Sequence, residues 1–222
     1  MRHIKGMLIV LCFIVIGNSL IKAQTEQSVK DFDGNVYKTV KIGNQTWMTE
    51  NLKTTHFNDG TAIPYVTDNT DWVYLTTPGY CWYENNPNSN KNTYGALYNW
   101  WAVKSDKLCP KGWHIPTDAE WITLIDFLGG LSIAGGKMKE SGLKHWESPN
   151  TGATDEYGFT ALPGGYRFSG IFTLIKWKGY WWSSTEYNTD KAWYMIILNN
   201  YANIYKNVDW KRSGLSVRCI KD

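Results

Sequence analysis

Residues 109–121 read CPKGWHIPTDAEW, and this stretch carries the clearest signal for local structure in the chain. Thr117 followed three residues later by Glu120 forms a capping box, in which the two side chains accept backbone N–H groups at a helix start. Apolar residues then follow at the spacing of one helical face before a glycine pair ends the pattern: Trp121, Leu124, Ile125, Leu128 and Gly129-Gly130. The sequence therefore predicts a helix that begins at Thr117 and buries one face. The capping role gives Glu120 a structural task in place of a catalytic one.

The segment upstream, DFDGNVYKTVKIGNQTWMTENL at residues 31–52, alternates Val36, Lys38, Val40 and Ile42 between turn residues. This alternation predicts a hairpin with one buried face, closed at Gly43-Asn44. Residues 85–92, NNPNSNKN, have the composition of a solvated loop, and they lack the regularly spaced carboxylates of a calcium loop. A second, weaker helix is predicted from about residue 94 to residue 103.

Beyond residue 155 the chain reads as strands and loops. Residues 192–198 and 201–206 flank Asn199-Asn200, which predicts a two-residue hairpin turn. The last strand is expected over residues 215–220, with Val217 and Cys219 on one face and Arg218 on the other. The whole pattern predicts one mixed α+β domain over residues 31–222, preceded by a loose polar lead-in at residues 24–30.

The N-terminus has the three-part pattern of a secretory signal peptide at residues 1–23, with cleavage expected between Ala23 and Gln24. Its apolar run, residues 7–16, is too short to span a bilayer, which needs about 20 residues. Arg2, Lys5 and Lys22 are three of the 23 basic residues, and the leader has no acid, so 20 bases face 20 acids in the rest. A neutral mature chain without a basic run lacks the electrostatic footprint of a nucleic-acid binder. We expect an exported protein, periplasmic or at the cell surface, with no membrane span in the mature chain.

Cys12 leaves with the leader, so Cys81, Cys109 and Cys219 remain in an oxidising compartment. Three thiols allow one disulfide, and the sequence alone does not fix the pairing. We predict Cys109 with Cys219, because this bridge would close a long loop and tie the last strand to the middle of the chain. No cysteine and histidine spacing indicates zinc, so neither a metal nor a cofactor is expected.

Four blocks carry a resemblance to a known family: CPKGWHIPTDAEW (109–121), GFTALPGGYR (158–167), GYWWSSTE (179–186) and SVRCIKD (216–222). Together with residues 31–52 and YGALYNWWAV (94–103), they resemble the Fibrobacter succinogenes major paralogous domain, over residues 31–222. The resemblance names a domain of exported bacterial proteins without naming a reaction.

The helix start and the closing strand are also distantly similar to the formylglycine-generating enzymes. That similarity implies a C-type-lectin-like fold, with a small irregular antiparallel sheet, one or two helices and long loops. It does not imply their chemistry, because the two nearby cysteines that hold copper are absent and Cys219 stands alone in that region.

Aromatic residues are abundant, with 13 Trp, 14 Tyr and 7 Phe, and their exposed members would form a platform for sugar rings or peptide groups. For each of them, packing in the core is the competing interpretation. Trp181 and Trp182 are adjacent in a predicted strand, so one is expected inside and the other outside. The candidate ligand-binding residues come from the second half of the chain: Tyr166, Arg167, Trp181, Trp182, Glu186, Trp193 and Trp210.

Three functions remain open from the sequence. A non-catalytic module that binds a glycan or another surface polymer is favoured, and an adhesive component with a cell-surface protein as partner is the alternative. An enzyme ranks lower, because His56, His114 and His145 accompany no serine or cysteine at a diagnostic spacing, and no catalytic residue is assigned. Asp155, Glu156 and Glu186 are available for a glycosidase pair, but the sequence does not place them opposite one another.

Overall fold

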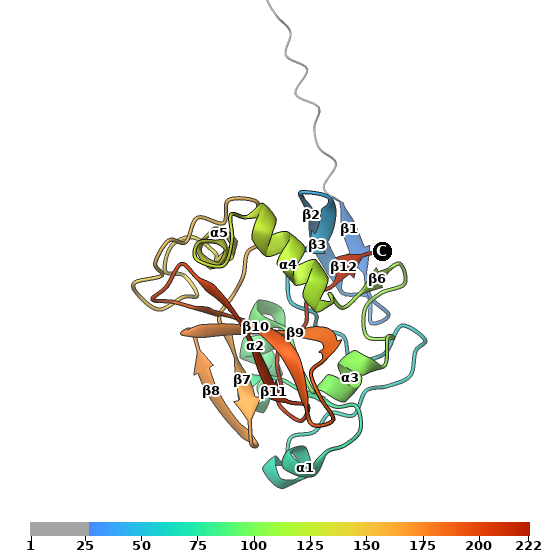
Figure 1. Cartoon of the computed structure of the whole chain (residues 1–222). Coiled ribbons are helices and arrows are strands. Elements are labelled where there is room, and N and C mark those ends of the chain that lie inside the picture. The colour runs from blue at the N-terminus through green and yellow to red at the C-terminus, as the bar shows by residue number, and fades with distance from the viewer. Residues whose placement is uncertain (1–26) are drawn as a thin grey trace, which may run out of the picture.

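The computed structural model describes residues 27–222 (Figure 1). The expected leader, its cleavage point and residues 24–26 lie outside this range. Within the range, four small antiparallel sheets and five short α-helices are joined by long irregular segments. This is the mixed α+β domain that the sequence predicts, but the expectation of one or two helices is wrong. No helix in residues 27–222 combines the length and apolar character needed to cross a bilayer.

The first sheet joins the two ends of the described chain. Its strands are β1 (Ser28–Lys30), β2 (Val36–Ile42), β3 (Gln45–Met48), β6 (Trp113–His114) and β12 (Ile220–Lys221), in the order β1-β2-β3-β12-β6 (Figure 1). The predicted β2–β3 hairpin is confirmed, whereas residues 28–30 of the expected loose lead-in form β1. The predicted last strand shortens to β12, because residues before it pair through single bridges. The predicted disulfide between Cys109 and Cys219 is present beside this sheet, and Cys81 is a buried free thiol.

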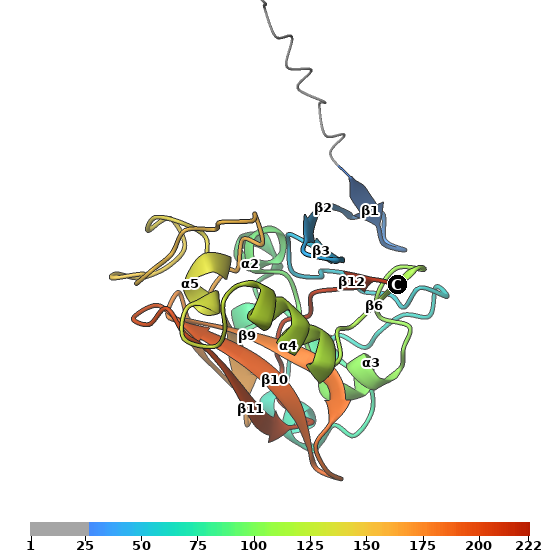
Figure 2. The ribbon, with the colours of Figure 1, turned by 45° about the horizontal axis from the view of Figure 1, so that its top comes forward.

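The largest strands form a second sheet in the order β11-β10-β9: β9 (Lys178–Glu186), β10 (Lys191–Leu198) and β11 (Ile204–Trp210). The predicted two-residue turn is wrong, because residues 199–203 all lie between β10 and β11. Figure 2 shows helix α4 (Asp118–Phe127) lying along this sheet. The capping box of α4 is present, and all four predicted core residues of this helix are buried.

The remaining elements are short. Two further sheets pair β4 (Tyr80–Cys81) with β5 (Leu97–Tyr98), and β7 (Gly164–Phe168) with β8 (Ile171–Ile175). The other helices are α1 (Asn69–Tyr74), α2 (Pro87–Tyr94), α3 (Trp100–Lys104) and α5 (Ala134–Met138), with a 3-10 turn at Tyr83–Asn85.

Two sequence predictions fail in this region. The expected loop at residues 85–92 is mostly α2, because Asn86 caps the N–H groups of Asn88 and Ser89 and Pro87 occupies the first helical position. The helix expected over residues 94–103 divides into β5 and α3, since Asn99 caps a new helix through the N–H of Ala102. Local capping by asparagine therefore outweighs the composition of both segments.

Most tryptophans pack in the interior. Eight of the 13 are buried, and they are Trp47, Trp72, Trp82, Trp100, Trp121, Trp146, Trp181 and Trp182. Trp177 is half exposed, at 50%, and the other four are partly buried. The aromatic content of the chain is thus mainly a property of its core.

Lys139 is completely buried beyond the end of α5, where it joins two loops. Its Nζ donates to the backbone carbonyls of Thr151 (2.8 Å), Leu198 (3.1 Å), Asn199 (3.3 Å) and Tyr201 (2.9 Å). Burial lowers the pKa of Lys139 to about 8. The ammonium therefore shares its three N–H donors among four carbonyls, of which that of Asn199 also accepts the N–H of Thr151.

We predict that Lys139→Met lowers the free energy of unfolding by about 3 kcal/mol or more, because a buried carbonyl without a donor costs about 1–3 kcal/mol. Urea denaturation followed by tryptophan fluorescence measures this loss. Lys144→Met makes the same change at an exposed position and should alter stability by less than about 0.5 kcal/mol. A Lys139→Met protein as stable as this control would contradict the structural role.

His114 on β6 bridges the start of α4 and the C-terminal residue of the chain. Its Nε2 lies 2.8 Å from Glu120 Oε1, and its Nδ1 lies 2.6 Å from Asp222 Oδ1. Burial alone would lower the pKa of His114, but the hydrogen bonds to Asp222 and Glu120 outweigh it and raise the pKa. The charged imidazolium, which donates from both nitrogens, is the form that stabilises this junction.

A group whose pKa is raised by folding stabilises below its unfolded pKa, and this contribution is lost as the pH rises through the folded pKa. We therefore predict that stability falls as the pH rises above about 6.5, the ordinary pKa of histidine. Urea midpoints between pH 5.5 and 9 for the wild type and for His114→Gln measure the effect by difference. Identical pH profiles of the two proteins would refute it.

Candidate functional site

An open groove of about 560 Å³ follows residues 65–77, which include α1. Its volume lies in the range of about 300–1,000 Å³ that is typical of small-ligand sites. The lining includes two tyrosines, two aspartates and four threonines: Tyr65, Tyr74, Asp68, Asp71, Thr67, Thr70, Thr76 and Thr77. This combination of ring faces, carboxylates and hydroxyls distinguishes the groove from a purely apolar hollow.

Arg167 on β7 holds one end of the groove segment in place. Its guanidinium donates to the carbonyls of Val66 (2.7 Å), Thr67 (2.9 Å) and Asp68 (3.1 Å), and to Asn69 Oδ1 (2.8 Å). The fifth contact, from Nε to the carbonyl of Gly170, ties the same side chain to the β7–β8 turn. One buried cation therefore shapes four consecutive residues of the groove segment.

The rings around Arg167 complete this anchor. The guanidinium lies 4.5 Å from the centre of the Trp72 ring on α1 and 4.8 Å from that of Phe172 on β8. Trp72 is completely buried, so it fixes α1 against the body of the domain. The other end of the segment is held by buried Asn99, whose Nδ2 donates to the carbonyl of Thr77 (2.7 Å).

Within the groove, the polar and aromatic side chains differ in solvent exposure and in whether another residue of the protein already contacts them. Asp68 Oδ1 caps α1 by accepting the N–H groups of Thr70 (2.7 Å) and Asp71 (3.0 Å). In the described part of the chain, the Asp71 carboxylate has neither a hydrogen bond nor a salt bridge. The Tyr74 side chain is 78% exposed, whereas Tyr65 stacks on Tyr80 at a centroid distance of 5.3 Å. Asp71 and Tyr74 are therefore the groups most open to a ligand.

Three of the predicted ligand-binding residues are corrected by the structure. Arg167, Trp181 and Trp182 are all completely buried. Trp181 packs in the core cluster of α4 and Trp182 packs in the cluster on the other face of β9, so both faces of the strand are covered. The two side chains do point to opposite faces, but the expectation that one lies outside is wrong.

The other four predicted residues retain some exposed surface and do not form one site. Tyr166 stacks on buried Tyr180 with a centroid distance of 4.3 Å. Glu186 is exposed and forms a salt bridge with Lys211. Trp193 and Trp210 are partly buried on β10 and β11. The sequence prediction therefore found exposed aromatics without finding the groove.

The groove residues that sequence reasoning missed lie in the stretch YVTDNTDWVY, residues 65–74. The signal that would have found α1 is Asp68 before a short helical segment with Asp71 in its first turn, a pattern typical of a capped helix. The groove itself had no local signal, because Arg167 and Asn99 reach it from residues distant in the sequence.

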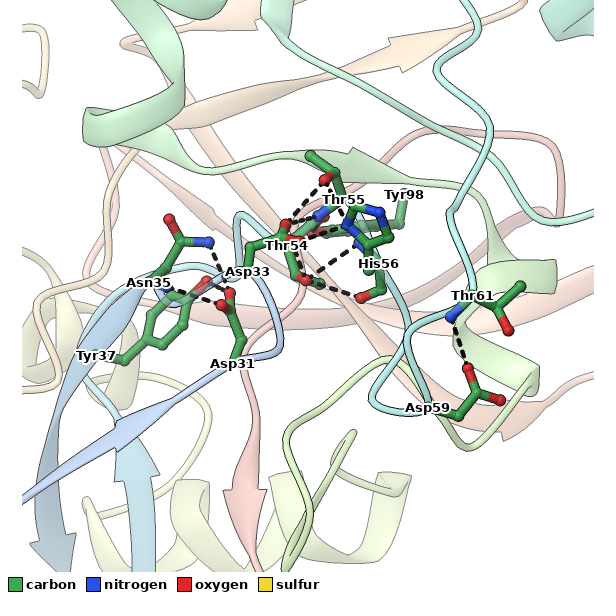
Figure 3. A network of polar contacts seen from close by, with 10 residues as sticks. All are labelled: Asp31, Asp33, Asn35, Tyr37, Thr54, Thr55, His56, Asp59, Thr61 and Tyr98. Atoms are coloured by element: carbon green, nitrogen blue, oxygen red, sulfur yellow. Dashed lines mark hydrogen bonds and ion pairs between the residues drawn. The ribbon is translucent and has the colours of Figure 1, made fainter.

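A second polar cluster lies between the turn before β2 and residues 54–56, and Figure 3 shows its members. Asp33 Oδ2 accepts the N–H (2.5 Å) and the hydroxyl (2.9 Å) of Thr55, and its Oδ1 lies 2.5 Å from His56 Nδ1. Burial alone would raise the pKa of Asp33, but these hydrogen bonds lower it overall. The cluster therefore attaches the turn before β2 to residues 54–56.

This cluster does not have the geometry of a catalytic triad. In a triad, the carboxylate and the nucleophile contact opposite nitrogens of the histidine, whereas here Asp33 and Thr55 both meet Nδ1 of His56. The nearby hydroxyl of Tyr37 donates to Asp31 (2.6 Å), so it is also engaged (Figure 3). His145 contacts the carboxylate of Glu140, as His114 contacts two carboxylates. The geometry of residues 27–222 also brings no three metal-ligating side chains together.

The fold and the groove thus define an α+β domain of short elements with an open polar groove along residues 65–77. The family model of the Fibrobacter succinogenes major domain matches residues 40–221, and the chain belongs to this family. No curated protein and no solved structure matches the sequence of this chain.

We predict that Arg167→Lys loosens the groove segment, because one ammonium replaces a planar fork that contacts five acceptors. Hydrogen exchange at the amides of Thr70 and Asp71 should become at least tenfold faster, and unfolding should require about 3 kcal/mol less. Arg212→Lys makes the same substitution at a partly exposed site and should change neither quantity. Unchanged exchange in Arg167→Lys would show that the fork does not hold the segment.

Proposed function

We propose that this domain is a non-catalytic binding module and that the groove along residues 65–77 recognises a neutral carbohydrate. The single observation that carries the proposal is the groove lining, in which tyrosine rings stand beside carboxylates and threonine hydroxyls. Aromatic faces stack on the apolar faces of sugar rings, and carboxylate and hydroxyl oxygens accept or exchange hydrogen bonds with sugar hydroxyls.

The charge of the groove determines which carbohydrates fit. Its lining contains Asp68 and Asp71 but no lysine, arginine or histidine. An anionic sugar would bring a further negative charge close to these two carboxylates, and the repulsion would weaken binding. A neutral glycan, presented as a polymer or as the end of a chain, is therefore the ligand class that we propose.

The same geometry argues against hydrolysis in the groove. A glycosidase places two carboxyl groups on either side of the scissile bond. Asp68 and Asp71 belong to one turn of α1, and Asp68 is engaged in capping that helix. They are therefore arranged to hold a sugar from one side.

The proposal includes two features that the sequence supports. Export to the periplasm or to the cell surface follows from the leader pattern of residues 1–23, which would bring the groove to extracellular polymers. A C-type-lectin-like arrangement is the finer fold assignment, and its support is the resemblance of the helix start and of the closing strand. A cell-surface protein is the alternative partner, and a flat apolar contact face in place of the polar groove would favour it.

We predict that the purified protein binds one or more neutral oligosaccharides in a panel of gluco-, manno-, xylo- and galacto-oligomers. Tyr74→Ala and Asp71→Asn should each weaken binding at least tenfold, a loss of about 1.4 kcal/mol. Isothermal titration calorimetry measures the affinities, and thermal unfolding checks that both variants remain folded.

Tyr205→Ala is the matched control, because Tyr205 is also exposed but lies on β11, outside the groove lining. Its affinity should equal that of the wild type. A folded wild type that binds no member of the panel, or a Tyr74→Ala variant with full affinity, would contradict the proposal.

A further inference from the structure

One end of the β10–β11 hairpin carries a group of tryptophans and cations, here called the cation–tryptophan surface. It consists of Lys191, Trp193, Lys206, Trp210 and Arg212. The strand register pairs Lys191 with Trp210 and Trp193 with Val208, so alternate residues place the strand members of the group on one face. Farther along the same face, Met195 and Ile197 pack in the core cluster of α4. Helix α4 thus covers the part of this face near Met195 and Ile197, and the cation–tryptophan surface lies on the part that α4 does not cover.

The cations lie directly over the indole rings. Lys206 Nζ is 3.9 Å from the centre of the Trp193 ring, and a salt bridge of 2.7 Å to Asp118 neutralises its charge. Lys191 Nζ and Arg212 Cζ lie 5.0 Å and 4.6 Å from the centre of the same Trp210 ring. Neither of these two cations forms a salt bridge within residues 27–222.

Two unpaired cations on one ring repel each other. Their distances from the shared ring centre place the charges less than 10 Å apart, which is within one Debye length at an ionic strength of about 0.1 M. Asp209 is a nearby carboxylate, but its partner in the register is Ala192, so it points to the opposite face. Burial raises its pKa, although Lys191 and Arg212 lower it in part, and its Oδ1 accepts the N–H of Trp210 (2.7 Å). An anion on the exposed side would relieve the repulsion.

We propose that the cation–tryptophan surface is a second binding site and that its ligand is a polysaccharide containing uronate residues. A sugar carboxylate can pair with Arg212, because a guanidinium offers two parallel donors to a carboxylate, and the charge of Lys191, less than 10 Å away, adds to the attraction. The ring of the sugar has apolar surface to contact beside them, on partly exposed Trp193 and on Tyr187, which is 52% exposed and lies edge-on to Trp193 at 5.0 Å.

The chemistry of this surface favours a uronate over a nucleic acid. A phosphate backbone needs an extended basic stripe, whereas residues 24–222 carry equal numbers of acids and bases and this surface offers two unpaired cations. The site also differs from the groove in sign, because the groove has carboxylates and no cation. Its existence does not depend on the proposed function of the groove.

The test compares two forms of one polymer. Calorimetry of the purified protein with oligogalacturonate and with its methyl ester changes only the charge of the ligand. We expect binding to the acid at least tenfold tighter than to the ester, with an affinity that falls as salt rises. The double variant Lys191→Gln/Arg212→Gln should lose at least tenfold in affinity for the acid.

The controls separate this site from its alternatives. Lys111→Gln/Lys144→Gln removes the same charge from exposed positions elsewhere and should leave the affinity unchanged. Tyr74→Ala in the groove should also retain full affinity for the acid, and a loss there would assign the binding to the groove and overturn this proposal. Equal binding of acid and ester, or full affinity in the Lys191→Gln/Arg212→Gln protein, would also overturn it. Equally strong competition by a DNA oligonucleotide would reveal general attraction to polyanions and refute the uronate assignment.

Discussion

The fold depends on buried cations that bind backbone carbonyls. Lys139, Arg167 and Arg218 are all completely buried, and no carboxylate forms a salt bridge with any of them in the described part of the chain. Arg218 donates to the carbonyls of Phe159 and Thr160 and to Asn51 Oδ1 (2.9 Å). Burial lowers the pKa of Arg218 to about 9 and that of Lys139 to about 8, so each buried charge carries a desolvation cost. A protein accepts this cost where many loop carbonyls would otherwise be buried without a donor.

This constraint explains how small sheets can support long ordered segments. The strands of the four sheets satisfy mainly their own backbone groups, and some segments outside them, such as residues 213–219, run buried without belonging to a helix or a strand ladder. Each buried cation gathers carbonyls from segments distant in the sequence, as Lys139 does for residues 151 and 198–201. The groove belongs to the same design, because Arg167 fixes residues 66–69 by the same kind of contact. Arg167, which the sequence suggests as a ligand contact, therefore holds the backbone of the groove segment from the interior.

The sequence predicts the features whose determinants lie close together in the chain. The capping box of Thr117 and Glu120 and the β2–β3 hairpin are encoded within a few residues, and both are present. The disulfide could be predicted because Cys81, Cys109 and Cys219 allow only three pairings. By contrast, the contact from Arg167 to Val66 spans 101 residues, and the hydrogen bond from the buried Trp181 indole to Asn51 Oδ1 spans 130. No local pattern reveals such contacts, so sequence reasoning names the buried Arg167, Trp181 and Trp182 as ligand candidates and misses the groove.

The two proposed sites follow from how the core uses its charged and aromatic residues. Because most tryptophans and three long cations are needed inside, the aromatic groups at the surface include five exposed tyrosines, three phenylalanines, Trp177 and the partly buried Trp193 and Trp210. The exposed tyrosines of the groove stand beside acids, and the two tryptophans stand beside bases. Aromatic surfaces alone discriminate poorly among sugars, since any ring face can stack on them. In both proposals the neighbouring charges therefore determine selectivity, with a neutral glycan assigned to the groove and an acidic one to the cation–tryptophan surface.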